Sequence, residues 1–284
     1  MIEYIKVIII SLVSGLLAPL PFSHSSAYSF LSYILDFYND SALFTFYYSV
    51  ITIAFALSVI VFLRKIYFKG FRALFSTKKS KLQNRSAYRK FMLNLLISLL
   101  PAAVMFVPIS KEKFLIDVFS DQLSSSHLIV TATCCLGSGL FLLIGGWYAK
   151  QKYDKAKRSA DLKSIVRFSV YQVASYFLPG VSSVSTGAVS LLISDIDNRV
   201  IVREVLTYIA PSALVVSVFR LVRTVLGGIV VNPLTVVLCA VFSVLGSSVM
   251  IALLSKVNFR KICVFFSIFS IIFGGGVVAM LFLS

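Results

Sequence analysis

Long apolar segments limit what this chain can fold into more than any other feature of its sequence. Six segments reach about the 17–25 residues that an apolar helix needs to cross a bilayer. They are residues 43–63, 92–109, 127–149, 204–222, 229–253 and 262–283. The chain of 284 residues is 58% hydrophobic, whereas soluble domains have about 45–50% apolar residues. The sequence therefore predicts an all-α polytopic membrane protein with about six transmembrane helices.

Two further apolar stretches, residues 5–35 and 165–193, are interrupted by proline. The first breaks at Pro19-Leu20-Pro21 and the second at Pro179-Gly180. Each remaining half has about 10–16 residues and is too short to cross a bilayer alone. Backbone outside a helix survives at membrane depth only where it is buried in protein or lines a polar cavity. We therefore expect two re-entrant helical hairpins, each returning to the side from which it entered.

Lys and Arg residues concentrate between the apolar segments. Ten lie in residues 64–90, seven in 150–167, two in 195–203 and three in 254–261. Basic segments between spans mark the cytoplasmic side. Both termini are then expected on the exterior side of the membrane. The net charge of +16 favours anionic lipids as partners and not a nucleic acid, because the basic residues form no separate soluble region.

The order of these elements predicts an inverted repeat within one membrane domain, residues 1–284. Repeat one covers about residues 1–149 and contains the hairpin 5–35, and repeat two covers about 150–284 and contains the hairpin 165–193. Each repeat is a broken hairpin followed by three spans. In transporters with this plan, interrupted helices at matching positions of the two halves form the central binding site.

Residues 1–27 have a second interpretation, a cleaved signal peptide, because a short apolar core ends in Ser25-Ser26-Ala27. Against it, Lys6 is offset by Glu3, and prolines lie where the apolar core should end. We expect these residues to belong to the membrane domain, and cleavage stays an open alternative.

Hydroxyl side chains follow each break. Ser23, His24, Ser25 and Ser26 follow the first break, and Ser182, Ser183, Ser185 and Thr186 follow the second. A helix that begins at a break has free backbone N–H groups and a positive dipole end, and nearby hydroxyls add donors. This combination suits an anion, which in a membrane is a lipid phosphate or diphosphate. The alternative is a pair of ordinary Pro-Ser/Thr kinks that pack helices closely.

The sequence around each break also carries an ordered motif. Residues 14–27 read SGLLAPLPFSHSSA, and residues 179–187 read PGVSSVSTG. They resemble two motifs of the bacterial undecaprenyl-diphosphate phosphatases, roughly E-G-x-x-E-[FW]-L-P-x-S-S-[ST]-G-H and P-G-x-S-R-S-G-x-T. The matching positions are Gly15, Leu20, Pro21, Ser23, Ser25, Pro179, Gly180 and Ser182, and Gly15, Pro21, Pro179 and Gly180 are the motif scaffold. Residues 99–103 and 209–212 also fit family spans, so the resemblance covers nearly the whole chain.

The functional side chains of that family are replaced in this sequence. The two motif glutamates fall on Ser14 and Ala18, the histidine on Ala27, the arginine on Ser183 and the threonine on Gly187. The resemblance implies that the family's acidic and histidine residues handle protons or bind a metal. It also implies that the family's arginine clamps the diphosphate. Phosphoanhydride cleavage needs charge neutralisation and a positioned nucleophile. Mg²⁺ or Ca²⁺ is therefore implied only if hydrolysis is retained, and local sequence predicts no metal site.

Three other residues are candidates to compensate for these replacements. His24 lies three residues before the lost histidine and is a candidate base or phosphate donor, with a histidine held at the membrane interface as the alternative. Arg220 and Arg223 are a candidate headgroup clamp. Their alternative is snorkelling of both side chains to the interface.

These observations lead to three hypotheses about function. The first is a phosphatase-like membrane protein that binds a polyprenyl phosphate or diphosphate in cell-envelope lipid recycling, with lost or reduced hydrolysis and with lipid translocation as an option. The second is an active undecaprenyl-diphosphate phosphatase that releases phosphate to give undecaprenyl phosphate. The third is a non-catalytic structural membrane partner. A homo-oligomer is compatible with all three.

Overall fold

The computed structural model describes residues 2–37, 40–75, 82–110, 113–120, 128–150, 159–197, 200–257 and 259–283. Within these ranges the chain forms thirteen helices and no strand, which confirms the all-α prediction. The first half contains α1 (Ile2–Leu17), α2 (His24–Ile34), α3 (Ser41–Phe62), α4 (Arg64–Phe75), α5 (Leu82–Ile97), α6 (Leu100–Met105), α7 (Leu115–Ser120) and α8 (Leu128–Lys150). The second half contains α9 (Leu162–Phe177), α10 (Ser183–Ile193), α11 (Ile201–Leu226), α12 (Pro233–Leu254) and α13 (Phe259–Leu283).

Six described segments are long and apolar enough to cross a membrane, as the sequence predicts. They are Ser41–Phe62, Ser86–Met105, Leu128–Trp147, Ile201–Leu226, Pro233–Leu254 and Ile262–Leu283. Each overlaps one of the six segments expected from hydropathy alone. The chain is therefore a multi-pass membrane protein.

The second of these segments has a break that the prediction of one uninterrupted span did not include. Helix α5 ends at Ile97, and α6 begins at Leu100 with Pro101 in its first turn. Pro101 has no N–H to donate to the carbonyl of Ile97, and its ring clashes with that carbonyl, so a continuous helix is interrupted there. Residues 64–90, expected as a basic loop, contain α4 and the start of α5.

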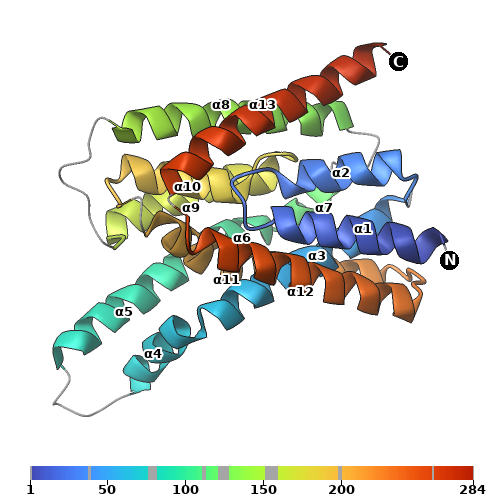
Figure 1. Ribbon diagram of the computed structural model, residues 1–284. Helices are drawn as coiled ribbons and strands as arrows, with labels where there is room; N and C mark the ends of the chain where they lie inside the picture. The colour runs from blue at the N-terminus through green and yellow to red at the C-terminus, as the bar shows by residue number, and fades with distance from the viewer. Residues whose placement is uncertain are drawn as a thin grey trace.

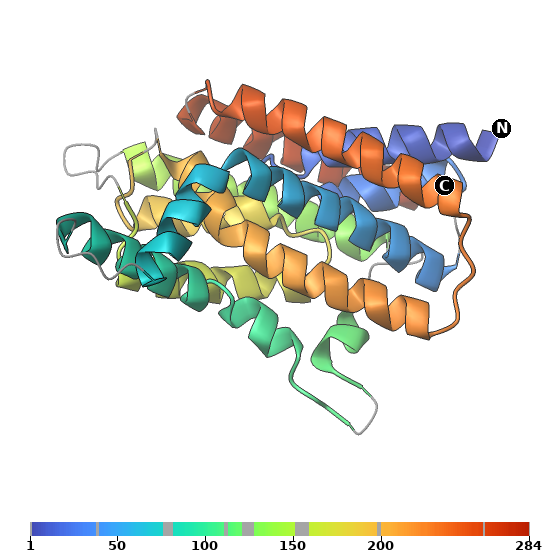
Figure 2. The same cartoon turned by 90° about the horizontal axis from the view of Figure 1, so that it is seen from below.

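Both proline-containing stretches turn back on themselves. Helix α1 ends at Leu17 and α2 begins at His24, while α9 ends at Phe177 and α10 begins at Ser183. Figures 1 and 2 show α2 running back toward the end of the molecule where α1 begins, and α10 running back toward the opposite end. The two breaks thus reach the middle of the bundle from opposite ends.

Helices from the two halves pack against one another in a matched pattern. Helix α3 packs along α11, and α8 packs along α13. Helix α1 packs along α12, and α9 packs against α5 and α6. In these four pairings, exchanging the two halves keeps α3 with α11 and α8 with α13, and it relates the α1–α12 pair to the packing of α9 on α5 and α6. The largest buried apolar cluster joins α3, α9, α10 and α11, and it includes Phe55, Phe168, Leu191 and Ile209.

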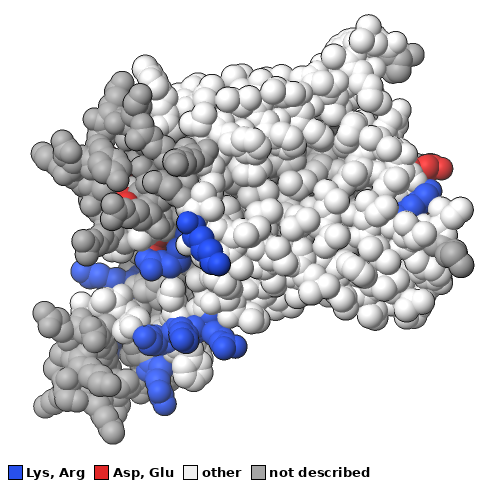
Figure 3. Space-filling view, in the orientation of Figure 1, with Lys and Arg blue, Asp and Glu red and all other residues white. Residues whose placement is uncertain are grey.

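Charge is distributed unevenly along the bundle. Figures 1 and 2 place the N- and C-termini at the same end of the molecule. Figure 3 shows most of the visible Lys and Arg side chains at the other end, including the region of α4 and α5. The same segregation is expected of a membrane protein whose basic end faces the cytoplasm.

The close packing of α1 on α12 depends on small residues. A Cβ atom added to Gly15 would lie 2.6 Å from the carbonyl oxygen of Ser243, and one added to Gly246 would lie 2.6 Å from that of Leu12. Helix pairs in membranes use such residues because they let the two backbones approach closely. The need for a glycine at the motif scaffold position Gly15 is therefore explained by packing.

We predict that Gly15→Ala lowers the free energy of unfolding by about 1–3 kcal/mol, because the added methyl forces α1 away from α12. Gly137→Ala is the matched control, since a Cβ at Gly137 in α8 would meet nothing within 4 Å. Thermal unfolding in detergent measures both. An equal or higher midpoint for Gly15→Ala than for Gly137→Ala would contradict the packing argument.

Candidate functional site

Two hydrogen bonds join the two breaks directly. The backbone N–H of Gly180 donates to Oγ of Ser25 at 3.2 Å, and Oγ of Ser185 donates to the carbonyl of Pro21 at 2.9 Å. The partners are 155 and 164 residues apart in sequence. Each break thus supplies a partner for a backbone group of the other.

Helix caps fix the shape of each break. Oγ of Ser23 accepts from the backbone N–H of Ser26, and Oγ of Ser182 accepts from that of Ser185. A side-chain oxygen at this position satisfies one of the free donors at a helix start. Ser23 and Ser182 therefore begin α2 and α10 in the same way.

Helix α8 supports both breaks from behind. Oγ of Ser26 donates to the carbonyl of Thr131 at 3.2 Å, and the N–H of Ser182 donates to Oγ of Ser138 at 3.3 Å. Gly180 has a φ of +93°, and a Cβ there would lie 2.1 Å from the Thr131 carbonyl oxygen. Only glycine fits this position, both for its backbone conformation and for the space available.

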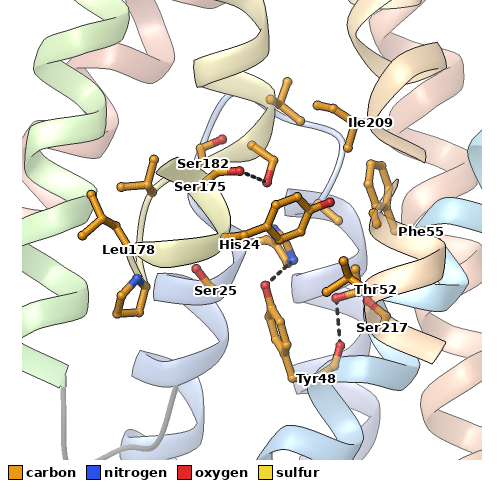
Figure 4. Close-up of a pocket in the computed structure, with 18 of the residues that line it drawn as sticks. His24, Ser25, Tyr48, Thr52, Phe55, Ser175, Leu178, Ser182, Ile209 and Ser217 are labelled. Carbon is orange, nitrogen blue, oxygen red and sulfur yellow. Dashed lines mark hydrogen bonds between the residues drawn. The ribbon is translucent and has the colours of Figure 1, made fainter. Parts of the chain in front are cut away.

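The joined breaks form one side of a cavity of about 50 Å³. Its other walls come from α3, α9 and α11 (Figure 4). A space of this size accommodates a few water molecules. The lining includes several hydroxyl groups and Arg220, and none of its described residues carries a carboxylate.

His24 and Tyr48 both line this cavity and contact each other. Nε2 of His24 lies 2.9 Å from the hydroxyl of Tyr48, and the two rings are stacked with their centroids 5.3 Å apart. Figure 4 shows the two side chains pointing toward one another from α2 and α3. Thr52, one helical turn after Tyr48, donates to the Tyr48 carbonyl. His24 is therefore held in the site by α3.

Arg220 is the one Lys or Arg among the described residues that line the cavity, and it is only 8% exposed. Its Nε has no hydrogen-bond partner, and no described carboxylate forms an ion pair with it. Arg220 also lines a second hollow of about 990 Å³ that includes Arg223 and Asp117. It thus lies between the inner cavity and this outer hollow.

Arg223 occupies a different environment from Arg220. Its guanidinium pairs with the carboxylate of Asp117 at 2.9 Å and lies over the ring of Phe114. Its side chain is 40% exposed. The structure therefore separates the two arginines that the sequence grouped as a headgroup clamp, and only Arg220 reaches the cavity.

The predicted hydroxyl groups divide into two sets. Ser25, Ser182 and Ser183 line the cavity together with His24 and Pro179. Ser23, Ser26, Ser185 and Thr186 do not line it; their side chains bond within or between the breaks. These four residues shape the site and lie behind its surface.

Several lining residues were not identified from the sequence. They are Tyr48 and Thr52 on α3, Ser175 and Tyr176 on α9, and Ser217 on α11. A signal was present, because Thr52 follows Tyr48 by four residues and Arg220 follows Ser217 by three. Such spacing places polar side chains on one face of an apolar helix.

The residues that replace the family's functional side chains show how this site differs from the site that the resemblance implies. Ala18 and Ser183 line the cavity, where the resemblance implies a glutamate and an arginine. Ser14 is buried and its Oγ has no partner, and Ala27 is buried in an apolar cluster with Phe22 and Cys135. The family's acidic and histidine functions therefore have no substitute at the same places.

The lining does not suit Mg²⁺ or Ca²⁺. Both ions prefer several oxygen ligands, with carboxylates supplying the negative charge. The lining has none, and the described residues contain no group of three or more His, Cys, Asp or Glu arranged to hold a metal. A buried arginine beside the cavity would also repel a divalent cation.

The fold and site define a polytopic helical membrane protein with a buried, cationic, hydroxyl-lined cavity between two broken helical segments. Residues 7–276 match the family of the bacitracin resistance protein BacA, the undecaprenyl-pyrophosphate phosphatase family, and the chain belongs to it. This family acts on a polyprenyl diphosphate lipid in a membrane. A search among curated proteins gave no match.

We predict that Ser25→Ala lowers the free energy of unfolding by about 1–3 kcal/mol, because the buried Gly180 N–H loses its acceptor. Ser185→Ala should lower the free energy of unfolding by about 1 kcal/mol. Because both bonds join the same two segments, the double variant Ser25→Ala/Ser185→Ala should lose less free energy of unfolding than the two single variants together.

Thermal or denaturant unfolding in detergent measures these differences, with Ser255→Ala as the control. Ser255 is exposed, and its hydroxyl donates to the nearby Ala252 carbonyl. Strictly additive effects, or effects no larger than that of Ser255→Ala, would show that the breaks do not stabilise one another.

Proposed function

We propose that this protein binds the phosphate or diphosphate headgroup of a polyprenyl carrier lipid in the cavity between the two breaks, with hydrolysis lost or strongly reduced. The observation that carries the proposal is Arg220, a buried cation that faces the cavity without a carboxylate partner. Family membership supplies the class of lipid.

The physical argument begins with the cost of burying charge. Removing an arginine from water without a counter-ion costs several kcal/mol even after relaxation. Polar and charged residues inside membrane proteins therefore mark ligand or ion sites. A guanidinium matches the geometry of phosphate oxygens through paired N–H donors. A bound phosphate would supply the missing negative charge, and the hydroxyls of Ser25 and Ser182 line the same cavity.

The same side chains argue against efficient hydrolysis. A serine nucleophile needs an adjacent general base. Oγ of Ser25 lies 3.0 Å from Oγ of Ser23 and accepts from Gly180, while Nε2 of His24 is paired with Tyr48. Phosphoryl transfer also needs several groups to neutralise charge on the phosphoryl oxygens. One arginine without acids or a metal site favours binding over cleavage.

The arrangement in the membrane follows from the same elements. Re-entrant hairpins at residues 5–35 and 165–193 enter from opposite sides as parts of an inverted repeat, 1–149 and 150–284. The matched packing of the two halves and the opposite directions of α2 and α10 support this arrangement. The basic end then faces the cytoplasm and both termini face the exterior of a bacterial plasma membrane. A central site between two hairpins that enter from opposite sides also suits translocation of the lipid.

An active phosphatase is the second candidate, and family membership favours it. In that case distant residues would supply the base and charge neutralisation, and Mg²⁺ or Ca²⁺ is a possible cofactor only in that case. The third candidate is a purely structural membrane partner. It would be supported if the protein bound no polyprenyl phosphate.

We predict that Arg220→Gln lowers retention of a polyprenyl phosphate by about tenfold or more, since a charge-assisted hydrogen bond contributes about 1.5–3 kcal/mol. The lipid-free variant should unfold at a higher temperature than the wild type, because an unpaired buried charge is removed. Native mass spectrometry and thermal unfolding measure the two effects.

Arg223→Gln is the control and should change lipid retention by less than about twofold, as expected for an exposed ion pair. If Arg220→Gln retained the lipid normally and unfolded earlier, Arg220 would have a structural role. The proposed site would then be wrong.

A second prediction concerns catalysis. Purified protein given the C55 diphosphate with Mg²⁺ or Ca²⁺ should release no more phosphate than a mock purification, because the cavity has no carboxylate. A phosphate-release assay measures this directly. Robust turnover that disappears in Ser25→Ala or His24→Ala would establish the active phosphatase instead.

A further inference from the structure

The face of α4 that points away from the bundle combines cations and aromatic rings. Arg64, Lys65, Lys69 and Arg72 are all exposed, and the helix contains no acid. Phe68 is 67% exposed on the same helix, with the Arg72 guanidinium 5.9 Å from the centre of its ring. Exposed phenyl rings among cations are typical of a surface that meets both acyl chains and headgroups.

The opposite face of α4 is fixed to the body of the protein. The hydroxyl of Tyr67 donates to the carbonyl of Thr207 on α11 at 2.6 Å. A Cβ on Gly70 would lie 2.9 Å from the ring of Phe91 on α5, so α4 and α5 approach closely there. The charged and aromatic face is therefore held outward, at the basic end of the molecule (Figures 1 and 3).

A groove of about 740 Å³ runs beside this face. The four cations of α4 line it, and Ile60, Met92 and Leu95 supply an apolar side from α3 and α5. None of the described residues that line the groove is acidic. Cationic and apolar walls in one groove complement a molecule with an anionic head and an apolar tail.

We infer that this groove is a binding site for an anionic phospholipid of the bilayer leaflet at the basic end. The phosphate lies among Lys65, Lys69 and the two arginines, and an acyl chain lies along Met92 and Leu95. The ordinary attraction of basic residues for an anionic leaflet, about fivefold in affinity per Lys or Arg, is here concentrated on one helix. The site is separate from the cavity at Arg220 and does not depend on the function proposed for that cavity.

The test is native mass spectrometry of the full chain in detergent, titrated with phosphatidylglycerol and, separately, with phosphatidylcholine. The wild type should retain phosphatidylglycerol preferentially. Lys65→Gln/Lys69→Gln should reduce that retention by about 25-fold. Lys65→Arg/Lys69→Arg should keep it, which excludes a loss caused by misfolding.

Arg89→Gln/Lys90→Gln is the matched control, because both residues are exposed on α5 and neither lines the groove. This pair and Arg220→Gln should leave phosphatidylglycerol retention unchanged. Equal retention of the two phospholipids by the wild type would show an apolar surface only and would overturn the site. An equal loss in the α4 and α5 double variants would show a general charge effect and would overturn it as well.

Discussion

The structure depends on the mutual satisfaction of two broken backbone segments inside an apolar bundle. A chain break at membrane depth leaves N–H and C=O groups that water cannot reach, and each unpaired group is costly. Here Ser25 accepts from Gly180, and Ser185 donates to Pro21. Because the exchange is reciprocal, each break supplies a hydrogen-bond partner for a backbone group of the other.

The position of the cavity follows from that junction. Helices α3 and α11, packed together, close the space in front of the breaks, and Arg220 reaches it from α11. Ala18 and Ser183 line the cavity where the resemblance implies an acid and an arginine, and Arg220 is the only fixed positive charge among the described lining residues. A single cation without acids stabilises a bound anion but provides little of what bond cleavage requires.

The six spans and the two breaks could be predicted from the sequence because hydropathy and proline act locally. The paired contacts could not, since Ser25 and Gly180 are 155 residues apart and nothing local specifies their register. The roles of the serines were also beyond local reasoning. Ser23 and Ser26 belong to the same short motif as Ser25, yet their hydroxyls serve a helix cap and a bond to α8.

The different environments of the two arginines of α11 also could not be predicted from local sequence. Both lie near the end of an apolar span, where snorkelling is the usual expectation. That expectation fits the exposed Arg223 and does not fit the buried Arg220. The difference arises from which helix face packs on α3, and polar residues at helical spacing, such as Ser217 and Arg220, were the available clue.

The most direct measurement of the central claim is an experimental structure of the protein in a lipid nanodisc with a polyprenyl phosphate bound. We predict phosphate density within hydrogen-bond distance of the Arg220 guanidinium, between the breaks that carry Ser25 and Ser182. Phosphate density beside Arg223 with an unoccupied inner cavity, or breaks that do not touch each other, would contradict the account.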